Sequence, residues 1–268
     1  MKESYNIADL RYLMKRLRDP KTGCPWDLKQ TYQTIASHSV EEVYEVVDAI
    51  ERNNIEHLSE ELGDLLFQII FYSQLGEEEG QFDFDAVVSN ITEKLLRRHP
   101  HVFPDGSLDS IRTDDQAASE KEIKRNWERI KQQERNERGE RGILEDIPRA
   151  LPALMRAAKL QKRAAGVGFD WTETVAVLEK LKEEITELET EIASANAQGI
   201  DDELGDVLFS CVNLARHLQV DPEKALARSN DKFKRRFDAM EALASVDDFS
   251  QLTVEEMETL WSKVKLAE

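Results

Sequence analysis

An acidic pattern occurs twice in this chain with the same internal spacing. In each half, two glutamates three residues apart are each followed, 19 residues further on, by an acid of a Glu-Leu-Gly-Asp segment. The two sets are Glu42, Glu45, Glu61 and Asp64, and Glu184, Glu187, Glu203 and Asp206. Carboxylate oxygens are ligands that Mg2+ and Mn2+ prefer, and four carboxylates around one gap repel one another without a cation. The pattern therefore predicts a site for Mg2+, with Mn2+ as a substitute.

The spacing is explained if each pattern folds as a helical hairpin. Each set of acids is symmetric about one residue, which is Asn53 in the first half and Ala195 in the second. These midpoints fall in polar stretches, 52–54 and 194–199, with the Asn and Gly residues typical of turns. Two antiparallel helices joined there would place the four carboxylates at matching distances from the turn. The i, i+3 spacing keeps the two acids of each helix on one face.

Apolar residues at helical spacing accompany the acids and predict helices rather than strands. They step by three and four residues along the hairpins. The main sets are Leu62, Leu65, Leu66, Ile69 and Ile70; Leu178, Leu181, Ile185, Leu188 and Ile192; and Leu204, Val207, Leu208, Cys211 and Val212. No alternating run with turn signals at both ends stands out. We therefore predict an all-α protein of two tandem duplicated helical bundles.

The repeat extends beyond the acids. A Lys-x-x-Arg-Arg segment begins at Lys94 and again at Lys232, and a Trp-x-x-x-Lys segment begins at Trp127 and again at Trp261. An aromatic residue beside an aspartate also precedes each hairpin. A duplicated domain explains all of these repeats. The predicted domains are residues 1–133 and 148–268, joined by a charged, glycine-bearing linker at 134–147.

Composition limits the classes of partner. The chain has 268 residues, enough for two helical domains, with 54 acidic and 36 basic side chains and a net charge of −18. This charge argues against general binding to a nucleic-acid backbone or an anionic membrane. Cys24 and Cys211 lack metal-site spacing, so we expect no disulfide framework and a cytoplasmic location. We expect neither a signal peptide nor a membrane-spanning segment.

Basic clusters complement the acids. Mg2+ is commonly held by a few carboxylates while phosphate oxygens complete its octahedron. Lys232 falls on one side of a helix with Arg235 or Arg236, where Arg binds phosphate through two hydrogen bonds and Lys acts as a point charge. A tryptophan face stacks on any base, which favours a broad nucleotide range. The combination fits metal-assisted attack of water on a nucleotide phosphorus.

The ordered motifs resemble the MazG family over nearly the whole chain. They are Pro-Trp-Asp, Glu-Glu-x-x-Glu, Glu-Leu-Gly-Asp, the run from Lys94 to Phe103, Asn-Trp-Glu-x-Ile-Lys from Asn126, and, in the second half, Val-Gly-Phe-Asp-Trp and Asn-Asp-Lys-Phe-x-Arg-Arg-Phe. The resemblance implies an all-α nucleoside triphosphate pyrophosphohydrolase. Such an enzyme cuts between the α and β phosphates with Mg2+, releases NMP and pyrophosphate, and acts as a homodimer.

The resemblance also implies roles for individual residues. The Mg2+ ligands would be Glu184, Glu187, Glu203 and Asp206. Glu183 would contact the substrate or orient the attacking water, and Glu184 is an equal candidate for activating it. The residues expected to contact the phosphates or close on the nucleotide are Lys180, Lys182, Lys232, Arg235, Arg236, Trp261 and Lys265.

In the family the N-terminal domain is thought to be mainly structural, an asymmetry that this sequence does not itself display. The first half offers a second site of the same kind from Glu42, Glu45, Glu61, Asp64, Lys94 and Arg98. One departure from the family motif is Asp202, where the family and the first half have Glu.

Other interpretations remain for the sequence. A ferritin-like di-iron protein needs Glu-x-x-His, and no histidine here has a glutamate three residues before it. A non-catalytic regulator or scaffold with nucleotide-binding helical domains is the main alternative, although neither acidic set has lost more than one Glu-to-Asp change. Trp261 is open between a core position and a platform for a base, whereas Trp26 and Trp171 are expected to pack against the bundle or to cap it.

Overall fold

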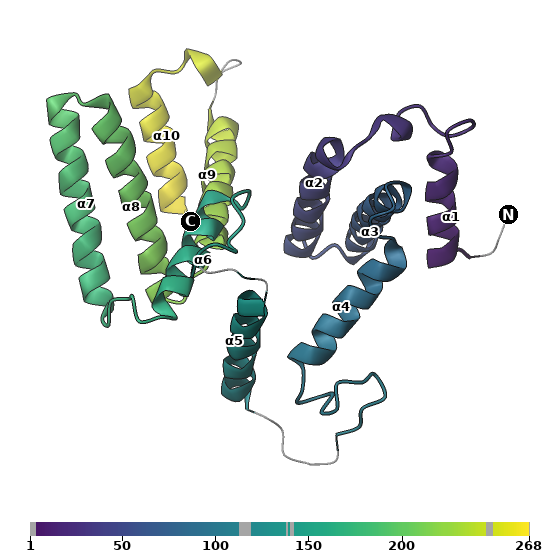
Figure 1. Cartoon of the computed structure of the whole chain (residues 1–268). Coiled ribbons are helices and arrows are strands. Elements are labelled where there is room, and N and C mark those ends of the chain that lie inside the picture. Colours follow the sequence, from purple (N-terminus) through teal and green to yellow (C-terminus); the bar gives the residue numbers. More distant parts are fainter. Residues whose placement is uncertain (1–3, 113–118, 138, 140–141, 245–248, 268) are drawn as a thin grey trace. The chain divides into compact units, whose positions relative to one another are not determined.

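The computed structural model describes residues 4–112, 119–137, 139, 142–244 and 249–267 (Figure 1). Every regular element in these ranges is a helix, and none is a strand, which confirms the all-α prediction. The chain divides into two compact units, Met1–Ile130 and Lys131–Glu268. Each unit is built around one long antiparallel hairpin of the kind that the acidic spacing predicts.

The first unit consists of α1 to α4 and the beginning of α5. Their bounds are α1 Ile7–Leu17, a 3-10 turn at Asp27–Lys29, α2 Tyr32–Glu51, α3 Ile55–Glu78, α4 Phe84–Arg98 and α5 Glu120–Glu137. Helices α2 and α3 form the hairpin, and α1 and α4 pack against α3. The core of the unit lies beside the C-terminal half of α3 and contains Met14, Ile35, Ile70, Phe71 and Leu75. This core fixes α3, and therefore its acidic residues, relative to α2.

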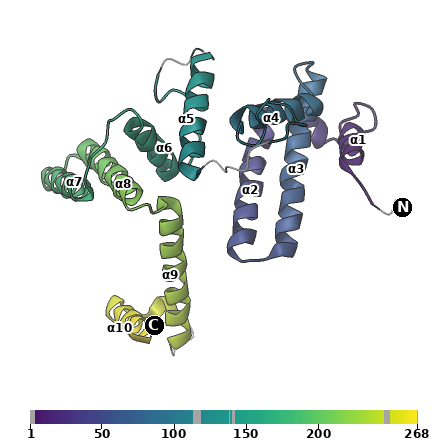
Figure 2. The same cartoon turned by 90° about the horizontal axis from the view of Figure 1, so that it is seen from below.

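The second unit contains α6 Ala153–Ala165, α7 Thr174–Ser194, α8 Ala197–His217, α9 Pro222–Leu243, a 3-10 turn at Phe249–Gln251 and α10 Val254–Ala267. Helices α7 and α8 form the hairpin, and α6 packs on α8. Helix α10 packs mainly on α9. Figure 2 shows α9 leaving the end of α8 and carrying α10 beside its far half. We refer to α9 and α10 together as the α9–α10 arm.

The hairpin turns lie where the symmetry of the acids predicts them. Asn53 and Ala195, the two calculated midpoints, both adopt the left-handed conformation, with φ of 56° and 53°. After each of them a backbone N–H reaches back five residues to the end of the helix: Asn54 donates to the Ala49 carbonyl at 3.0 Å, and Asn196 to the Glu191 carbonyl at 3.1 Å. This is the Schellman arrangement, which closes a helix and reverses the chain. The two turns are therefore structural equivalents.

The domain limits differ slightly from those expected. The units meet between residues 130 and 131, within α5, and the first four residues of the predicted linker continue that helix to Glu137. Residues 138, 140 and 141 of the linker lie outside the described residues. Both cysteines are free thiols. In the described part of the chain, no helix combines the length and apolar character needed to cross a membrane.

Candidate metal centre and nucleotide site

The hairpin of the second unit brings three of the four predicted ligands together. Glu184 and Glu187 lie on α7 and Glu203 lies on α8, and each offers a carboxylate oxygen within 4.8 Å of the other two. Glu184 is buried, with 6% of its surface exposed, while Glu187 is exposed. Asp206, one turn beyond Glu203, falls outside this close group. Three carboxylates at this separation form a cluster that can hold a divalent cation.

The electrostatics of the cluster also fit a cation. Burial raises the pKa of Glu203 above its ordinary value, and the neighbouring charges of Glu187, Asp206 and Glu184 raise it further. The Oε2 atom of Glu203 is buried and has no hydrogen-bond partner among the described residues. A buried carboxylate oxygen without a partner is costly, and a bound cation would satisfy it. The donor set, made only of oxygen, suits Mg2+ or Mn2+.

Lys180 lies at the edge of the cluster, one turn before the acids of α7. Its ammonium group is 3.0 Å from carboxylate oxygens of both Glu183 and Glu184. Hydrogen bonds to Glu184 and then Glu183 raise the pKa of Lys180, so it stays charged. The sequence could have predicted this pairing, because side chains three and four residues apart are neighbours on a helix surface. Lys182, also expected to contact the substrate, is exposed on the same helix and forms no ion pair with a described residue.

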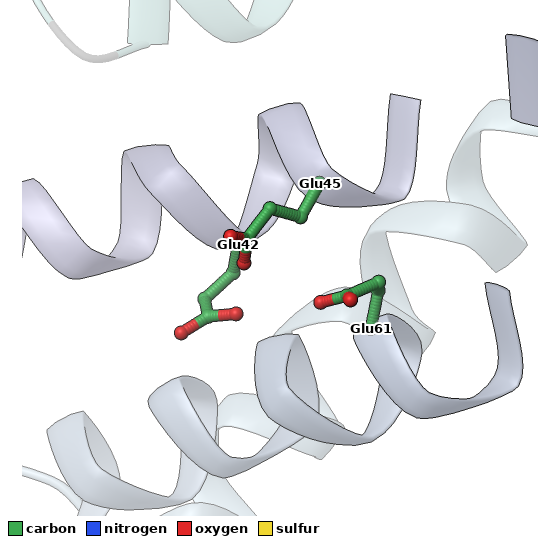
Figure 3. A group of neighbouring side chains, drawn as sticks. All are labelled: Glu42, Glu45 and Glu61. Atoms are coloured by element: carbon green, nitrogen blue, oxygen red, sulfur yellow. The ribbon is translucent and has the colours of Figure 1, made fainter. Parts of the chain in front are cut away.

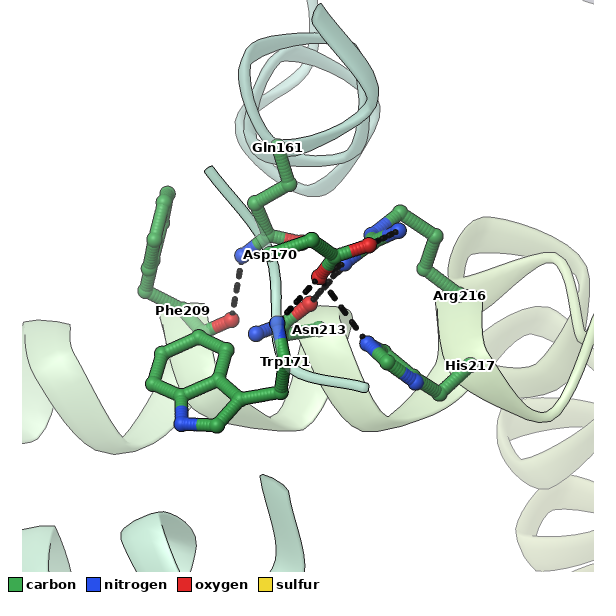
Figure 4. Close-up of polar contacts among 7 residues, drawn as sticks. All are labelled: Gln161, Asp170, Trp171, Phe209, Asn213, Arg216 and His217. Carbon is green, nitrogen blue, oxygen red and sulfur yellow. Dashed lines mark hydrogen bonds and ion pairs between the residues drawn. The ribbon is translucent and has the colours of Figure 1, made fainter. Parts of the chain in front are cut away.

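A polar network fastens the segment before α7 to the end of α8 (Figure 4). Asp170 accepts hydrogen bonds from both terminal nitrogens of Arg216, one at 2.9 Å, and His217 Nε2 lies 3.1 Å from the same carboxylate. Arg216 also donates to Asn213 Oδ1 at 2.7 Å. Arg216 holds the pKa of Asp170 at about 2, below the ordinary 3.8. The network sets where α7 begins relative to α8, and so the register of their acids.

Sequence reasoning identified the aromatic-Asp pair at this position but not its partners. Arg216 and His217 belong to neither repeated motif, and only the fold brings them to Asp170. Trp171, beside Asp170, is 41% exposed, and Trp26 in the first unit is 54% exposed. Each therefore lies half-covered on the segment that precedes its hairpin, and the Trp26 ring contacts the His38 ring of α2 at 6.1 Å.

The remaining predicted substrate residues lie on the α9–α10 arm. Trp261 of α10 packs 5.5 Å from the Phe233 ring, and the Arg236 guanidinium lies over Trp261 at 5.9 Å. Lys232 and Arg235 border an open hollow on α9. In this single chain the arm leads away from the end of α8, whereas the acids lie in the middle of the α7–α8 hairpin (Figure 2). Contact of these arm residues, and of Lys265, with a nucleotide stays a prediction.

The first unit repeats the acidic cluster (Figure 3). Glu42 and Glu45 of α2 and Glu61 of α3 offer oxygens within 4.8 Å of one another, and Asp64 again falls outside the close group. Glu61 is 7% exposed. Burial, followed by the charges of Asp64 and Glu45, raises the pKa of Glu42. In both halves the structure therefore brings together three of the four carboxylates that the spacing predicts.

The fold and these clusters define an all-α protein with a duplicated carboxylate centre. In agreement, the MazG nucleotide pyrophosphohydrolase domain matches residues 30–103 and again 173–240, and each match contains one acidic hairpin. The chain belongs to the MazG family, as its motifs predicted.

Curated relatives extend the match to nearly the full length. A nucleoside triphosphate pyrophosphohydrolase of Escherichia coli K12 is 47% identical over 266 residues, which cover 98% of each chain. A protein of Thermotoga maritima named nucleoside triphosphate pyrophosphohydrolase/pyrophosphatase MazG is 39% identical over 97% of this chain and 95% of its own. An uncharacterised Bacillus subtilis protein, YabN, is 41% identical over 98% of this chain, which spans 52% of YabN.

Proposed function

We propose that the second unit hydrolyses nucleoside triphosphates to NMP and pyrophosphate with Mg2+, over a broad range of bases. The observation that carries the proposal is the cluster of Glu184, Glu187 and Glu203, with its buried, unpartnered Glu203 oxygen. Membership of the MazG family and the names of the full-length relatives support the reaction type. The four acids of this half, including Asp206, would hold the metal.

Mg2+ bound there would supply Lewis-acid polarisation of the phosphate oxygens. The protein's own acids would position the attacking water. Glu184 is buried against Lys180 and faces the cluster, while the side chain of Glu183 is 57% exposed and shares the same lysine. Either carboxylate can accept a proton from water within hydrogen-bond reach. Lys180 and Lys182 would neutralise charge on the triphosphate from the same helix.

The basic side chains of the arm would hold the outer phosphates. Lys232, Arg235 and Arg236 offer charge-assisted hydrogen bonds, and Trp261 with Lys265 would close on the nucleoside. Because α9 leads away from the hairpin, this contact requires either a movement of the arm or a second copy of the chain. The second route is compatible with the homodimer that the family resemblance implies.

Apolar side chains on the hairpin support a homodimer. On α7, Leu178, Ile185 and Ile192 recur every seven residues and are 40%, 41% and 57% exposed. On α8, Leu204 and Leu208 are 47% and 51% exposed. A heptad stripe that is exposed among the described residues of its unit fits pairing with the same stripe of a second copy. We therefore propose that two chains associate through their hairpins.

The decisive experiment separates the possible products. Purified protein is incubated with ATP and with dTTP, with and without Mg2+, and NMP plus pyrophosphate is resolved from NDP plus phosphate. Metal-dependent NMP and pyrophosphate from both substrates is the expected result. The absence of turnover with every triphosphate would overturn the proposal and favour the regulatory or scaffold alternative.

A further inference from the structure

A hollow lies between α6 and α8, on the side of α8 away from the acidic cluster. Val212, in its wall, comes nine residues after Glu203, which is about two and a half helical turns, so the two side chains lie on opposite faces of α8. The hollow has a volume of about 390 Å³, within the range of ligand pockets. Its apolar walls include Leu151, Leu154, Ala157, Leu160, Phe209 and Val212. It is therefore separate from the proposed nucleotide site.

Small residues on both helices leave this space open. Gln161 of α6 donates through Nε2 to the Phe209 carbonyl of α8 at 2.8 Å, and this bond sets the separation of the helices beside the hollow (Figure 4). From α6 the hollow is lined by Ala153 and Ala157, which are too short to fill it. Gly205 of α8 supplies no side chain, and a Cβ added there would meet no atom within 4 Å. The space can therefore accept another molecule without displacing a large side chain.

In the first unit the corresponding aromatic residue is covered by the chain itself. Equivalent positions of the two hairpins differ by 142, as Glu42 and Glu184 do, so the counterpart of Phe209 is Phe67. Phe67 is partly buried and packs against a core that includes Met14 of α1. Phe209, in contrast, is 43% exposed. The second unit thus leaves uncovered an apolar face that the first unit covers with its own side chains.

Two arginines border the hollow, and neither has a counter-ion. Arg156 lies near the start of α6, and Arg149 precedes that helix. The Nε atom of Arg156 is buried and has no hydrogen-bond partner among the described residues. Over the same residues, no carboxylate forms an ion pair with either arginine. Glu223 of α9, which approaches the start of α6, accepts a hydrogen bond from the Met155 backbone N–H at 3.3 Å instead. A bound anion would satisfy the buried guanidinium.

We propose that this hollow binds a small organic carboxylate whose body is a hydrocarbon chain. A carboxylate matches the planar guanidinium of Arg156 or Arg149 and accepts two parallel hydrogen bonds from it. Among the described residues that line the hollow, only these two carry polar side chains. A ligand body with many polar atoms, such as a nucleoside, would leave its hydrogen bonds unmade there, whereas a hydrocarbon chain needs none.

The test is isothermal titration calorimetry of the full-length protein with octanoate, and with 1-octanol as a neutral analogue of the same chain length. Arg156→Met removes the unpartnered guanidinium, and Ala157→Phe fills the hollow from α6. Lys159→Met is the matched control, because Lys159 is exposed on the same helix, lies outside the hollow and changes the charge equally. Circular dichroism verifies folding. If Ala157→Phe does not fold, Arg149→Met replaces it, since Arg149 is exposed.

Light scattering is recorded for the wild type and Ala157→Phe, because a second copy of the chain could cover the same space. Leu208, at the rim of the hollow, also belongs to the exposed stripe that supports a homodimer. The proposal predicts the same mass for both proteins. Absence of octanoate binding by the wild type, together with a changed mass of Ala157→Phe, would overturn the proposal and assign the hollow to a contact between copies.

Octanoate should bind the wild type about tenfold or more tightly than 1-octanol does, and each methylene added between hexanoate and octanoate should tighten binding about fourfold. Arg156→Met and Ala157→Phe should each weaken octanoate binding by about tenfold or more, and Lys159→Met should stay within about twofold of the wild type. Equal binding of octanoate and 1-octanol would overturn the proposal, as would wild-type binding by Arg156→Met or the absence of binding by the wild type. These readouts do not involve nucleotide, so the proposed function is tested separately.

Discussion

Replacing Asp170 by Asn removes the charge at the centre of the network that fastens α7 to α8. Asp170 accepts two hydrogen bonds from Arg216, and His217 lies beside the same carboxylate. Only 24% of the side-chain surface of Asp170 is exposed. The substitution keeps the size of the side chain but leaves Arg216 beside a neutral amide. The second unit should lose stability, because a partly buried Arg without its carboxylate is unfavourable.

The pKa of Asp170 gives the magnitude. It is held at about 2, against an ordinary value of 3.8. At about 1.4 kcal/mol for each pKa unit, this difference corresponds to about 2 kcal/mol of stability at neutral pH. Between these two pKa values the unfolded state binds more protons than the folded state, so the free energy of unfolding falls as the pH falls. The contribution is complete above about pH 5 and is lost below about pH 2.

Differential scanning calorimetry at pH 7 and pH 3 measures both effects. Asp170→Asn should lower the transition of the second unit by roughly 5–10 °C at pH 7, and by less at pH 3, where the wild type has itself lost part of the contribution. Asp201→Asn, an exposed substitution on α8 with the same change of charge, is the matched control. If both variants have the same transition temperature at pH 7, the network does not stabilise the unit and the reasoning is refuted.

Three further predictions concern the hairpins. Ala195→Gly should stabilise the second unit by about 1 kcal/mol in urea denaturation, because Ala195 has a left-handed φ of 53° that Gly adopts without strain; an unchanged midpoint would contradict this. Lys180→Met should strengthen nucleotide-free Mn2+ binding several-fold, because it removes a cation 3.0 Å from Glu184, and should raise KM for ATP; weaker Mn2+ binding would count against the assigned cluster. Glu45→Gln should leave ATP turnover within a few-fold of wild type, whereas a large loss would make the first unit catalytic.

The sequence alone predicted the hairpins accurately, and the reason is geometric. Symmetric acids on two antiparallel helices must centre on the turn, and both centres, Asn53 and Ala195, adopt the left-handed conformation at the turn of their hairpin. The 3.6-residue period likewise determined which acids share a face. Spacing within one hairpin is therefore sufficient to place Glu42, Glu45 and Glu61 together.

Features that depend on contacts between hairpins and other elements could not be predicted in this way. Helical periodicity says which face of α9 is basic, but not the direction in which α9 leaves α8. The partners of Asp170 come from a helix end 46 residues away, with no motif to mark them.

The most direct test of the central claim compares two glutamates on α7. Glu187→Gln removes a carboxylate of the cluster, whereas Glu189→Gln makes the same change at an exposed position two residues away, on a different face of the helix. With ATP and Mg2+, Glu187→Gln should reduce pyrophosphate release at least 100-fold while its melting temperature stays near that of the wild type. Glu189→Gln should remain within about twofold of the wild-type rate. Wild-type turnover by a folded Glu187→Gln protein would contradict catalysis at this cluster.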